Sequence, residues 1–249
     1  MARYDFRSPR LYVAASLSPG APLTLEKPQA HYLRNVLRLK HGDAILAFNG
    51  KDGEWRTTLR DGGKRATDLM VETRVREQTA AGDLHYLFAP LKHERLDYMV
   101  QKVVELGVSR LVPVLTQHTQ ASRVNLERMR ANAIEAAEQC GILNLAEVKE
   151  PVTFAQMIAG RDTGRLLVFC DEDAEVKDPA SALAAHRASG ARPLAVLIGP
   201  EGGFSDEERA TLLKTPNVVR LALGPRILRA DTAAVAALTL VQTVLGDWR

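Results

Sequence analysis

Two patterns of hydrophobic and polar positions divide the chain. Through residue 75, short apolar runs alternate with turn-forming pairs such as Asn49-Gly50 and Asp52-Gly53. Turns this close together are typical of β-hairpins. They predict a small β-barrel, interrupted by one helix over His31–Leu37. The strands expected in it are Leu11–Val13, Ala44–Phe48, Glu54–Leu59 and Leu69–Val75.

From about residue 83, strand-like runs alternate with helical patterns. A stripe of apolar residues at helical spacing ends at Gly107 and predicts a helix over Glu94–Leu106. Ser205 and Glu208 have the spacing of a capping box and start a helix that runs to Leu213. This alternation predicts a mainly parallel sheet with helices on both faces. The other strands expected are Leu84–Ala89, Arg110–Leu115, Leu166–Cys170, Leu194–Ile198 and Val218–Leu223, and the other helices are Asn125–Cys140, Ala180–Arg187 and Thr232–Leu245.

Composition adds a charge asymmetry to this picture. The 249 residues are 46% hydrophobic and 25% charged, which excludes a disordered chain and fits one large or two unequal domains. Residues 1–75 hold 13 Lys and Arg against 8 Asp and Glu, whereas residues 76–249 hold 20 against 22. A basic front indicates contact with a polyanion, although five charges also serve solubility. The polar stretch Arg76–Asp83 is the expected linker.

Cysteine usage and hydropathy exclude several classes of protein. Cys140 and Cys170 stand alone, without partners at metal-ligand spacing, which excludes a disulfide framework and a zinc site. Neither a signal peptide nor a run of about 18 apolar residues is present. We therefore expect a cytoplasmic protein with no metal and no membrane partner.

The loop that follows the strand Leu194–Ile198 is rich in glycine. It reads Gly199-Pro-Glu-Gly-Gly-Phe-Ser205 and then opens a helix, whose N-terminus favours anionic groups. Glycine lets the backbone approach a ligand closely, but the spacing matches neither a P-loop nor a dinucleotide-binding motif. The loop is either a ligand site or a plain strand-to-helix turn.

A second loop follows the strand that ends near Leu223. It carries Arg226 and Arg229 before the last helix begins, and Asp231 is either the N-cap of that helix or a functional carboxylate. The arginines are either surface charges or part of a site. Because both loops end strands and start helices, we expect them at one edge of the sheet, where ligands bind in open α/β folds.

These stretches together resemble the SPOUT methyltransferases and, more narrowly, the bacterial 16S rRNA uridine-N3 methyltransferase family (ribosomal RNA small subunit methyltransferase E). The likeness extends over nearly the whole chain. It rests on Arg10–Val13, His31–Asp43, Lys92, Gln101–Val108, Glu135–Gly141, Gly199–Phe204 and Leu223–Ala233.

The resemblance implies an α/β SPOUT fold with a C-terminal trefoil knot, plus an N-terminal PUA-like β-barrel. Residues 1–75 would then bind RNA, and residues 76–249 would hold S-adenosylmethionine in a homodimer. The reaction implied is methyl transfer to N3 of a uridine in 16S ribosomal RNA of the assembled small subunit. The implied cofactor-binding residues are Leu197, Gly199, Pro200, Gly202, Leu223, Gly224, Ile227 and Leu228.

The chemistry of uracil suggests roles for the charged residues. Uracil N3 carries a proton and is a poor nucleophile until that proton leaves, so a base or a cation that favours the deprotonated ring is needed. Arg229 is the candidate to stabilise negative charge on the carbonyls, and Asp231 is the candidate to orient the base or accept the proton. Glu201 is a second candidate carboxylate. The expected RNA-binding residues are Arg10, Arg34, Arg38, Lys40 and Lys92, with Tyr32 as either a stacking platform or core.

The sequence departs from the family pattern in three stretches. Gln117-His118 stands where the family has Glu-Arg, Ile142 where it has Arg, and Asp231-Thr232 where it has Glu-Thr. Two basic positions of an RNA-facing rim are thereby weakened or lost. Two alternatives stay open, a SPOUT enzyme that methylates a ribose 2′-oxygen and a non-catalytic RNA-binding protein of ribosome assembly. A nucleotide-binding α/β protein is disfavoured because phosphate motifs are missing.

Overall fold

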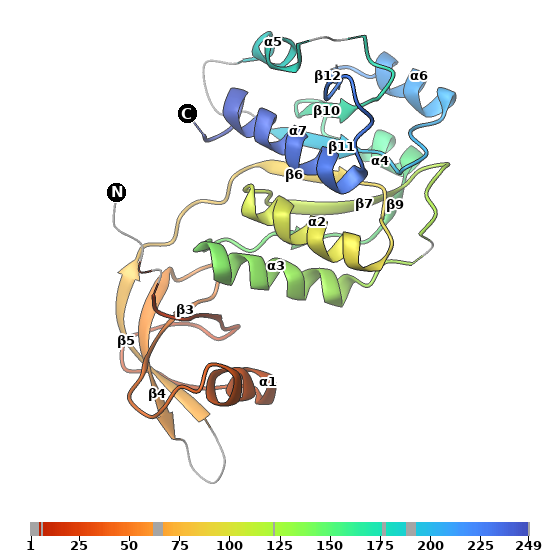
Figure 1. The fold of residues 1–249 in the computed structure, drawn as a ribbon. Helices are drawn as coiled ribbons and strands as arrows, with labels where there is room; N and C mark the ends of the chain where they lie inside the picture. Colours follow the sequence, from red (N-terminus) through yellow and green to blue (C-terminus); the bar gives the residue numbers. More distant parts are fainter. Residues whose placement is uncertain are drawn as a thin grey trace. The chain divides into compact units, whose positions relative to one another are not determined.

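The computed structural model describes residues 5, 7–61, 67–121, 123–175, 178–187 and 193–248 (Figure 1). The chain forms two compact units. The first comprises Met1–Ala80 together with Ala137–Leu145, and the second comprises Ala81–Ala136 together with Ala146–Arg249. Each is described by itself.

The first unit is built on a five-stranded sheet. Its strands are β1 (Arg10–Tyr12), β2 (Pro22–Thr24), β3 (Ala44–Phe48), β4 (Glu54–Asp61) and β5 (Thr67–Arg76), in the spatial order β1-β3-β4-β5-β2. Among the described strand pairs of this unit, only β1–β3 is parallel. Ile45, Leu59 and Leu69 on the sheet pack around Leu33, and all four side chains are fully buried. The four expected strands are thereby confirmed, whereas the three-residue β2 was not predicted.

The helical stretch of the first unit starts earlier than expected. Helix α1 (Lys27–His31) begins with Pro28 in its first turn and continues into a π-helical turn over Tyr32–Val36. Arg38 follows with a φ of 57°, a left-handed backbone conformation that residues other than glycine rarely adopt. Tyr32 is half-buried against the core of the unit.

The second unit is built on a parallel sheet. Its strands are β6 (Leu84–Phe88), β7 (Arg110–Leu115), β8 (Glu147–Val148), β9 (Val152–Thr153), β10 (Leu166–Cys170), β11 (Leu194–Ile198) and β12 (Val218–Leu221). The spatial order is β12-β10-β11-β6-β7-β8, with β9 paired to β7. Every described pair is parallel. The expected parallel sheet is confirmed.

Helices cover both faces of this sheet. On one face, Leu197 and Phe169 pack in one cluster with Met157 of α4 (Phe154–Gly160) and Leu212 of α6 (Asp206–Lys214). On the other face, the hydroxyl of Tyr86 lies 3.2 Å from Sδ of Met99 in α2 (His93–Glu105). Helix α7 (Ala230–Val244) runs beside α2 (Figure 1). The sheet is therefore buried on both sides, as its continuous apolar strands predict.

The helix starts show where sequence signals were sufficient. Ser205 and Glu208 form the predicted capping box of α6, and Asn125 accepts a bond from the backbone N–H of Arg128 in α3 (Leu126–Cys140). Helix α7 instead begins at Ala230, so the N-cap is Arg229, and the alternative that Asp231 is the cap is wrong. The expected helix over 180–187 is observed as α5 (Pro179–Ala184). The short elements β8, β9 and α4 were not predicted.

Candidate active site

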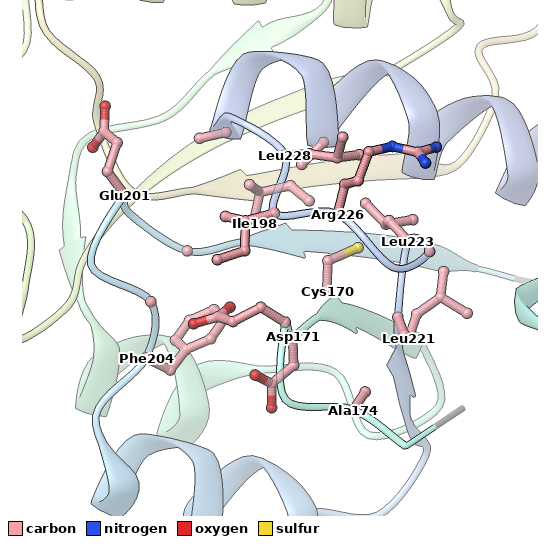
Figure 2. Close-up of a pocket in the computed structure, with 18 of the residues that line it drawn as sticks. Cys170, Asp171, Ala174, Ile198, Glu201, Phe204, Leu221, Leu223, Arg226 and Leu228 are labelled. Atoms are coloured by element: carbon pink, nitrogen blue, oxygen red, sulfur yellow. The ribbon is translucent and has the colours of Figure 1, made fainter. Parts of the chain in front are cut away.

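Three neighbouring strands of the second unit end at the same edge of the sheet. Cys170, the last residue of β10, lies opposite Ile198 of β11 on one side and Leu221 of β12 on the other. Three loops leave from there, which we name the acidic loop (171–175), the glycine loop (199–204) and the arginine loop (222–229). They enclose a cavity of about 720 Å³ (Figure 2). This volume lies within the range of about 300–1,000 Å³ that is usual for small-molecule and cofactor sites.

The glycine loop has conformations that other residues would strain. Gly203 has a φ of +68°, and a Cβ there would lie 2.3 Å from Oε1 of Glu172 in the acidic loop. A Cβ on Gly199 would lie 3.1 Å from the ring of Phe204, which is buried edge-to-face against Phe169. Glycine is favoured at Gly203 by its positive φ and at Gly199 by the tight contact with Phe204.

The acidic loop is attached to the fold by its first residue. The Asp171 side chain has no exposed surface, and its Oδ2 accepts bonds from Nε of Arg209 at 2.9 Å and from Nε of Arg220 at 2.7 Å. These partners belong to α6 and β12, so one carboxylate holds the loop, the helix and the strand together. The sequence reading missed this residue, although a carboxylate directly after an apolar strand was a signal that could have found it.

The arginine loop forms the wall of the cavity next to α7. Gly224 has a φ of +101°, and Ile227 is 87% exposed although it lines the cavity. Arg226 also lines the cavity, whereas Arg229 and Asp231 do not. Arg229 and Asp231 flank Ala230, which lines the cavity at the start of α7. Arg229 is exposed, whereas Asp231 is half-buried. Oδ1 of Asp231 accepts a bond from the backbone N–H of Thr232.

Most of the predicted cofactor residues line this cavity. They are Gly199, Pro200, Gly202, Leu223, Gly224, Ile227 and Leu228. Leu197 does not line it, because alternate residues of a strand face opposite sides of the sheet and Leu197 points into the cluster with Phe169. Its neighbour Ile198 faces the cavity instead (Figure 2). The structure thus brings two predicted loops together and adds a third.

The charges on the cavity wall favour a ligand that is not a polyphosphate. Carboxylates come from Asp171, Glu172, Glu175 and Glu201, against one guanidinium, that of Arg226. Two of these carboxylates have described partners, since Asp171 is bonded as above and Glu201 lies 3.4 Å from Nη1 of Arg95. Burial raises the pKa of the Cys170 thiol to about 12, with a further contribution from Asp171, so this thiol is not a thiolate nucleophile near neutral pH.

The expected RNA-binding residues of the first unit differ in their surroundings. The Arg34 side chain is bonded to Asp61 and to the carbonyl of Arg60, and it is 24% exposed. Arg38 and Lys40 are exposed on the segment that follows the π-helical turn. In the second unit, Lys92 is exposed at the N-cap of α2.

Arg10 lies in a different environment from the one expected. Its side chain is only 8% exposed and donates from Nε to Glu54 at 2.6 Å. Nη1 donates to the carbonyls of Ala137 and Glu138, at the C-terminal end of α3, and the guanidinium lies 4.6 Å from the Phe48 ring centroid. All three side-chain nitrogens of Arg10 donate hydrogen bonds within the unit, so its environment does not support the expected role as a phosphate contact.

The departures from the family pattern also have local explanations. Ile142 packs against a small cluster of Phe48, Ala137 and Leu143, which is an apolar environment. The imidazole of His118 lies against the glycine loop, with Nδ1 3.1 Å from the carbonyl oxygen of Gly202. Sequence reasoning gave neither of these contacts.

Comparisons with known proteins agree with this geometry. A family model described as an RNA methyltransferase domain matches residues 77–242, and one described as an RNA methyltransferase PUA domain matches residues 25–68. The chain therefore contains an RNA methyltransferase domain. A Synechocystis protein named ribosomal RNA small subunit methyltransferase E is 32% identical over 95% of this chain and 78% of its own length. The chain belongs to the ribosomal RNA small subunit methyltransferase E family.

Further relatives extend the match to whole chains. The Rickettsia conorii protein of the same name is 28% identical over 96% of both sequences. A Legionella pneumophila methyltransferase solved with bound S-adenosylmethionine is 28% identical, covers 95% of this chain and 98% of its own, and superposes with a TM-score of 0.78. The Neisseria gonorrhoeae structure named ribosomal RNA small subunit methyltransferase E shares the fold, with 24% identity, 98% and 100% coverage and a TM-score of 0.84.

The described residues form neither a membrane-spanning helix nor a cluster of metal ligands. Within the part of the chain that is described, no helix is both long and apolar enough to cross a membrane. In the same part, no three His, Cys, Asp or Glu side chains gather into a cluster able to hold a metal ion.

Proposed function

We propose that this protein transfers a methyl group from S-adenosylmethionine to N3 of a uridine in 16S ribosomal RNA of the assembled small subunit. The observation that carries the proposal is the cavity at the ends of β10, β11 and β12, lined by seven of the eight residues expected from the family pattern. The named relatives support the target, the ribosomal RNA of the small subunit, and the N3 position is what the resemblance of the sequence motifs implies.

The residues of the cavity fit S-adenosylmethionine. Gly199, Gly202 and Gly203 line the cavity without a side chain of their own, so the backbone of the glycine loop can approach a nucleoside base closely. Ile198, Leu221 and Leu228 provide apolar surface, and the carboxylates of the wall suit a ligand that carries a sulfonium and an ammonium group. When bound, the cofactor supplies an electrophilic methyl group on sulfur. The Legionella protein with bound S-adenosylmethionine supports this assignment.

The acceptor side of the reaction is assigned to the start of α7. A C–N bond forms at uracil N3 as the methyl–sulfur bond breaks, and the N3 proton leaves the ring. We assign Arg229 to the stabilisation of negative charge on the uracil carbonyls and Asp231 to the orientation of the base or the acceptance of its proton. Both residues flank Ala230, which lines the cavity, and this position supports the assignment.

The architecture proposed follows the family. Residues 1–75 form a PUA-like barrel that binds RNA, and residues 76–249 form a SPOUT methyltransferase domain. Its C-terminal segment passes through a trefoil knot, and the protein works as a cytoplasmic homodimer. Arg34, Arg38 and Lys40 of the barrel, with Lys92, contact RNA phosphates.

The cofactor part of the proposal is tested by calorimetric titration of the purified protein with S-adenosylmethionine. Saturable binding at one site per chain is expected, and a Gly203→Val variant should lose it. The matched control is Gly160→Ala, at a position with nothing within 4 Å of an added Cβ. Failure of the wild-type protein to bind the cofactor would favour the alternative of a non-catalytic RNA-binding protein.

A further inference from the structure

The glycine loop is held from outside the cavity by a histidine. His118 lies in the segment that follows β7, and its Nδ1 is 3.1 Å from the carbonyl oxygen of Gly202 and 3.2 Å from that of Gly203. Both partners are acceptors only, so Nδ1 must carry the hydrogen and donate to the loop. In the neutral ring this fixes one tautomer, with Nε2 left unprotonated.

Packing keeps this contact in register. A Cβ on Gly202 would lie 3.3 Å from Cβ of His118, so the imidazole stands directly against the backbone of the loop. On the other side, a Cβ on Gly203 would lie 2.3 Å from Oε1 of Glu172. The two glycines thus pass between His118 and the acidic loop, and each lacks the side chain that would push one neighbour away.

The segment that carries His118 is itself fixed to α6. The backbone N–H of Gln117 donates to Oε1 of Glu208 at 2.9 Å, and Oε2 of the same carboxylate accepts from the Ser205 backbone N–H at 3.0 Å. Glu208 therefore caps α6 and holds the segment that carries His118. The distance from His118 to the glycine loop is set by these bonds, because Ser205 directly follows that loop.

We infer that His118 is a positioning residue for the methyl donor: its Nδ1–H, bonded to the Gly202 and Gly203 carbonyls, holds the glycine loop in the shape that binds S-adenosylmethionine. The inference rests on the proposed function, since it concerns the same cavity. His118 is not among the residues that line that cavity, so we assign it no contact with the cofactor. Its effect is expected on cofactor affinity and not on the methyl-transfer step.

Three variants separate the donor from the shape of the ring. His118→Asn keeps an N–H donor near the position of Nδ1, His118→Gln places its donor near Nε2, and His118→Phe keeps a ring without a donor. Loss of one such bond is expected to raise the Kd for S-adenosylmethionine about three- to tenfold. We expect this loss for Phe and Gln, with Asn within about twofold of the wild type.

The control is Gln117→Ala. It lies next to His118, its side chain is exposed, and the bond from its backbone N–H to Glu208 is retained. This variant should bind the cofactor as the wild type does. In transfer assays, the loss in the Phe and Gln variants should appear in KM for the cofactor, with kcat unchanged at saturating cofactor.

A spectroscopic readout tests the contact without the cofactor. Nitrogen-15 NMR of the His118 ring in the cofactor-free protein should show that Nδ1 carries a hydrogen. Finding the Nε2–H tautomer, or a Phe variant that binds as tightly as the wild type, would overturn the inference while leaving the proposed function intact. A wild-type protein that does not bind S-adenosylmethionine would overturn both.

Discussion

Nε of Arg220 donates to Oδ2 of Asp171 across 2.7 Å, and the carboxylate that accepts this bond is completely buried. Arg209 donates to the same oxygen. A buried charge left without its partner costs about 3–5 kcal/mol. The wall of the cavity thus depends on one ionic cluster that joins β10, β12 and α6.

Replacement of Asp171 by alanine should therefore destabilise the protein by about 3–5 kcal/mol, because two guanidinium groups lose a buried counter-charge. Urea unfolding of Asp171→Ala against the wild type measures this. Asp173→Ala is the control, since that carboxylate pairs with the same Arg209 but is 66% exposed, and its loss should cost less than about 1 kcal/mol. Equal effects of the two variants would contradict the assignment.

The glycine loop gives a second prediction. Gly203→Ala places a side chain at a φ of +68° and against Glu172, so stability should fall by about 1–2 kcal/mol and cofactor affinity should fall with it. The double variant Gly203→Ala with Glu172→Ala removes the steric clash and keeps the backbone strain. Urea unfolding of the two should show partial recovery of stability in the double variant, and no recovery would mean that backbone strain alone is responsible.

Arg10 and Arg38 should behave differently although both are basic residues of the first unit. Arg10→Ala leaves the buried Glu54 with only Arg76, at 3.4 Å, as its ion-pair partner, so the protein should lose about 1.5–3 kcal/mol of stability. Arg38→Ala should keep the unfolding midpoint and weaken RNA binding uniformly. It should also reduce the slope of log K against log salt by about one unit. RNA-binding titrations at several salt concentrations, with urea unfolding alongside, distinguish the two.

The sequence alone predicts the parallel sheet and two of the cavity loops, but not the surroundings of Arg10. The alternation of apolar strands with capped helices predicts the parallel sheet, because burial on both faces demands continuous apolar runs. The two loops with glycine and arginine were found because their residue types are unusual at strand ends. Arg10 was placed on the surface because a buried arginine and an exposed one look alike in sequence, and only the fold brings Glu54 and the end of α3 to it.

The acidic loop and the contact that His118 makes with the glycine loop were not predicted, for a related reason. A run of carboxylates reads as a solvated turn, and its role depends on Arg209 and Arg220, which are 38 and 49 positions away in the sequence. The contact of His118 with Gly202 spans 84 positions. Contacts between residues so far apart in the sequence leave no trace in the pattern of hydrophobic and polar positions. The short elements β8 and β9 have two residues each, which is too few for an alternating pattern.

His85 makes stability depend on pH. Burial first, then the positive charges of Arg165 and Arg110, lower its pKa to about 4 from the ordinary 6.5. The unfolded chain therefore binds a proton between pH 6.5 and 4 that the folded protein does not, and stability falls as the pH drops through this window.

The expected loss from pH 7 to pH 5 is on the order of 1 kcal/mol, after allowance for partial exposure. Urea unfolding at both pH values measures it, and His85→Gln should lessen the dependence. Asp83 does not interfere in this window. Its pKa is lowered below the ordinary 3.8, chiefly by its hydrogen bond with Arg165, so its own contribution is lost only at more acidic pH. A His85→Gln variant with an unchanged pH dependence would contradict the role of this histidine.

Arg229 tests the chemistry at the start of α7. Arg229→Ala should lower kcat about 100-fold, as loss of a charge-stabilising donor does, with the Kd for S-adenosylmethionine within about twofold of the wild type. Arg229→Lys keeps the positive charge without the planar fork and should lie between the two. Full activity in the alanine variant would remove Arg229 from the mechanism.

The central claim is that the chain methylates N3 of a uridine in 16S ribosomal RNA. The most direct measurement incubates the protein with labelled S-adenosylmethionine and small ribosomal subunits from a strain that lacks the corresponding gene, and then maps the modified nucleoside by mass spectrometry. We predict one labelled methyl group per 16S molecule, on the base nitrogen N3 of a uridine. Label on a ribose oxygen, or no transfer to 16S RNA, would contradict the account.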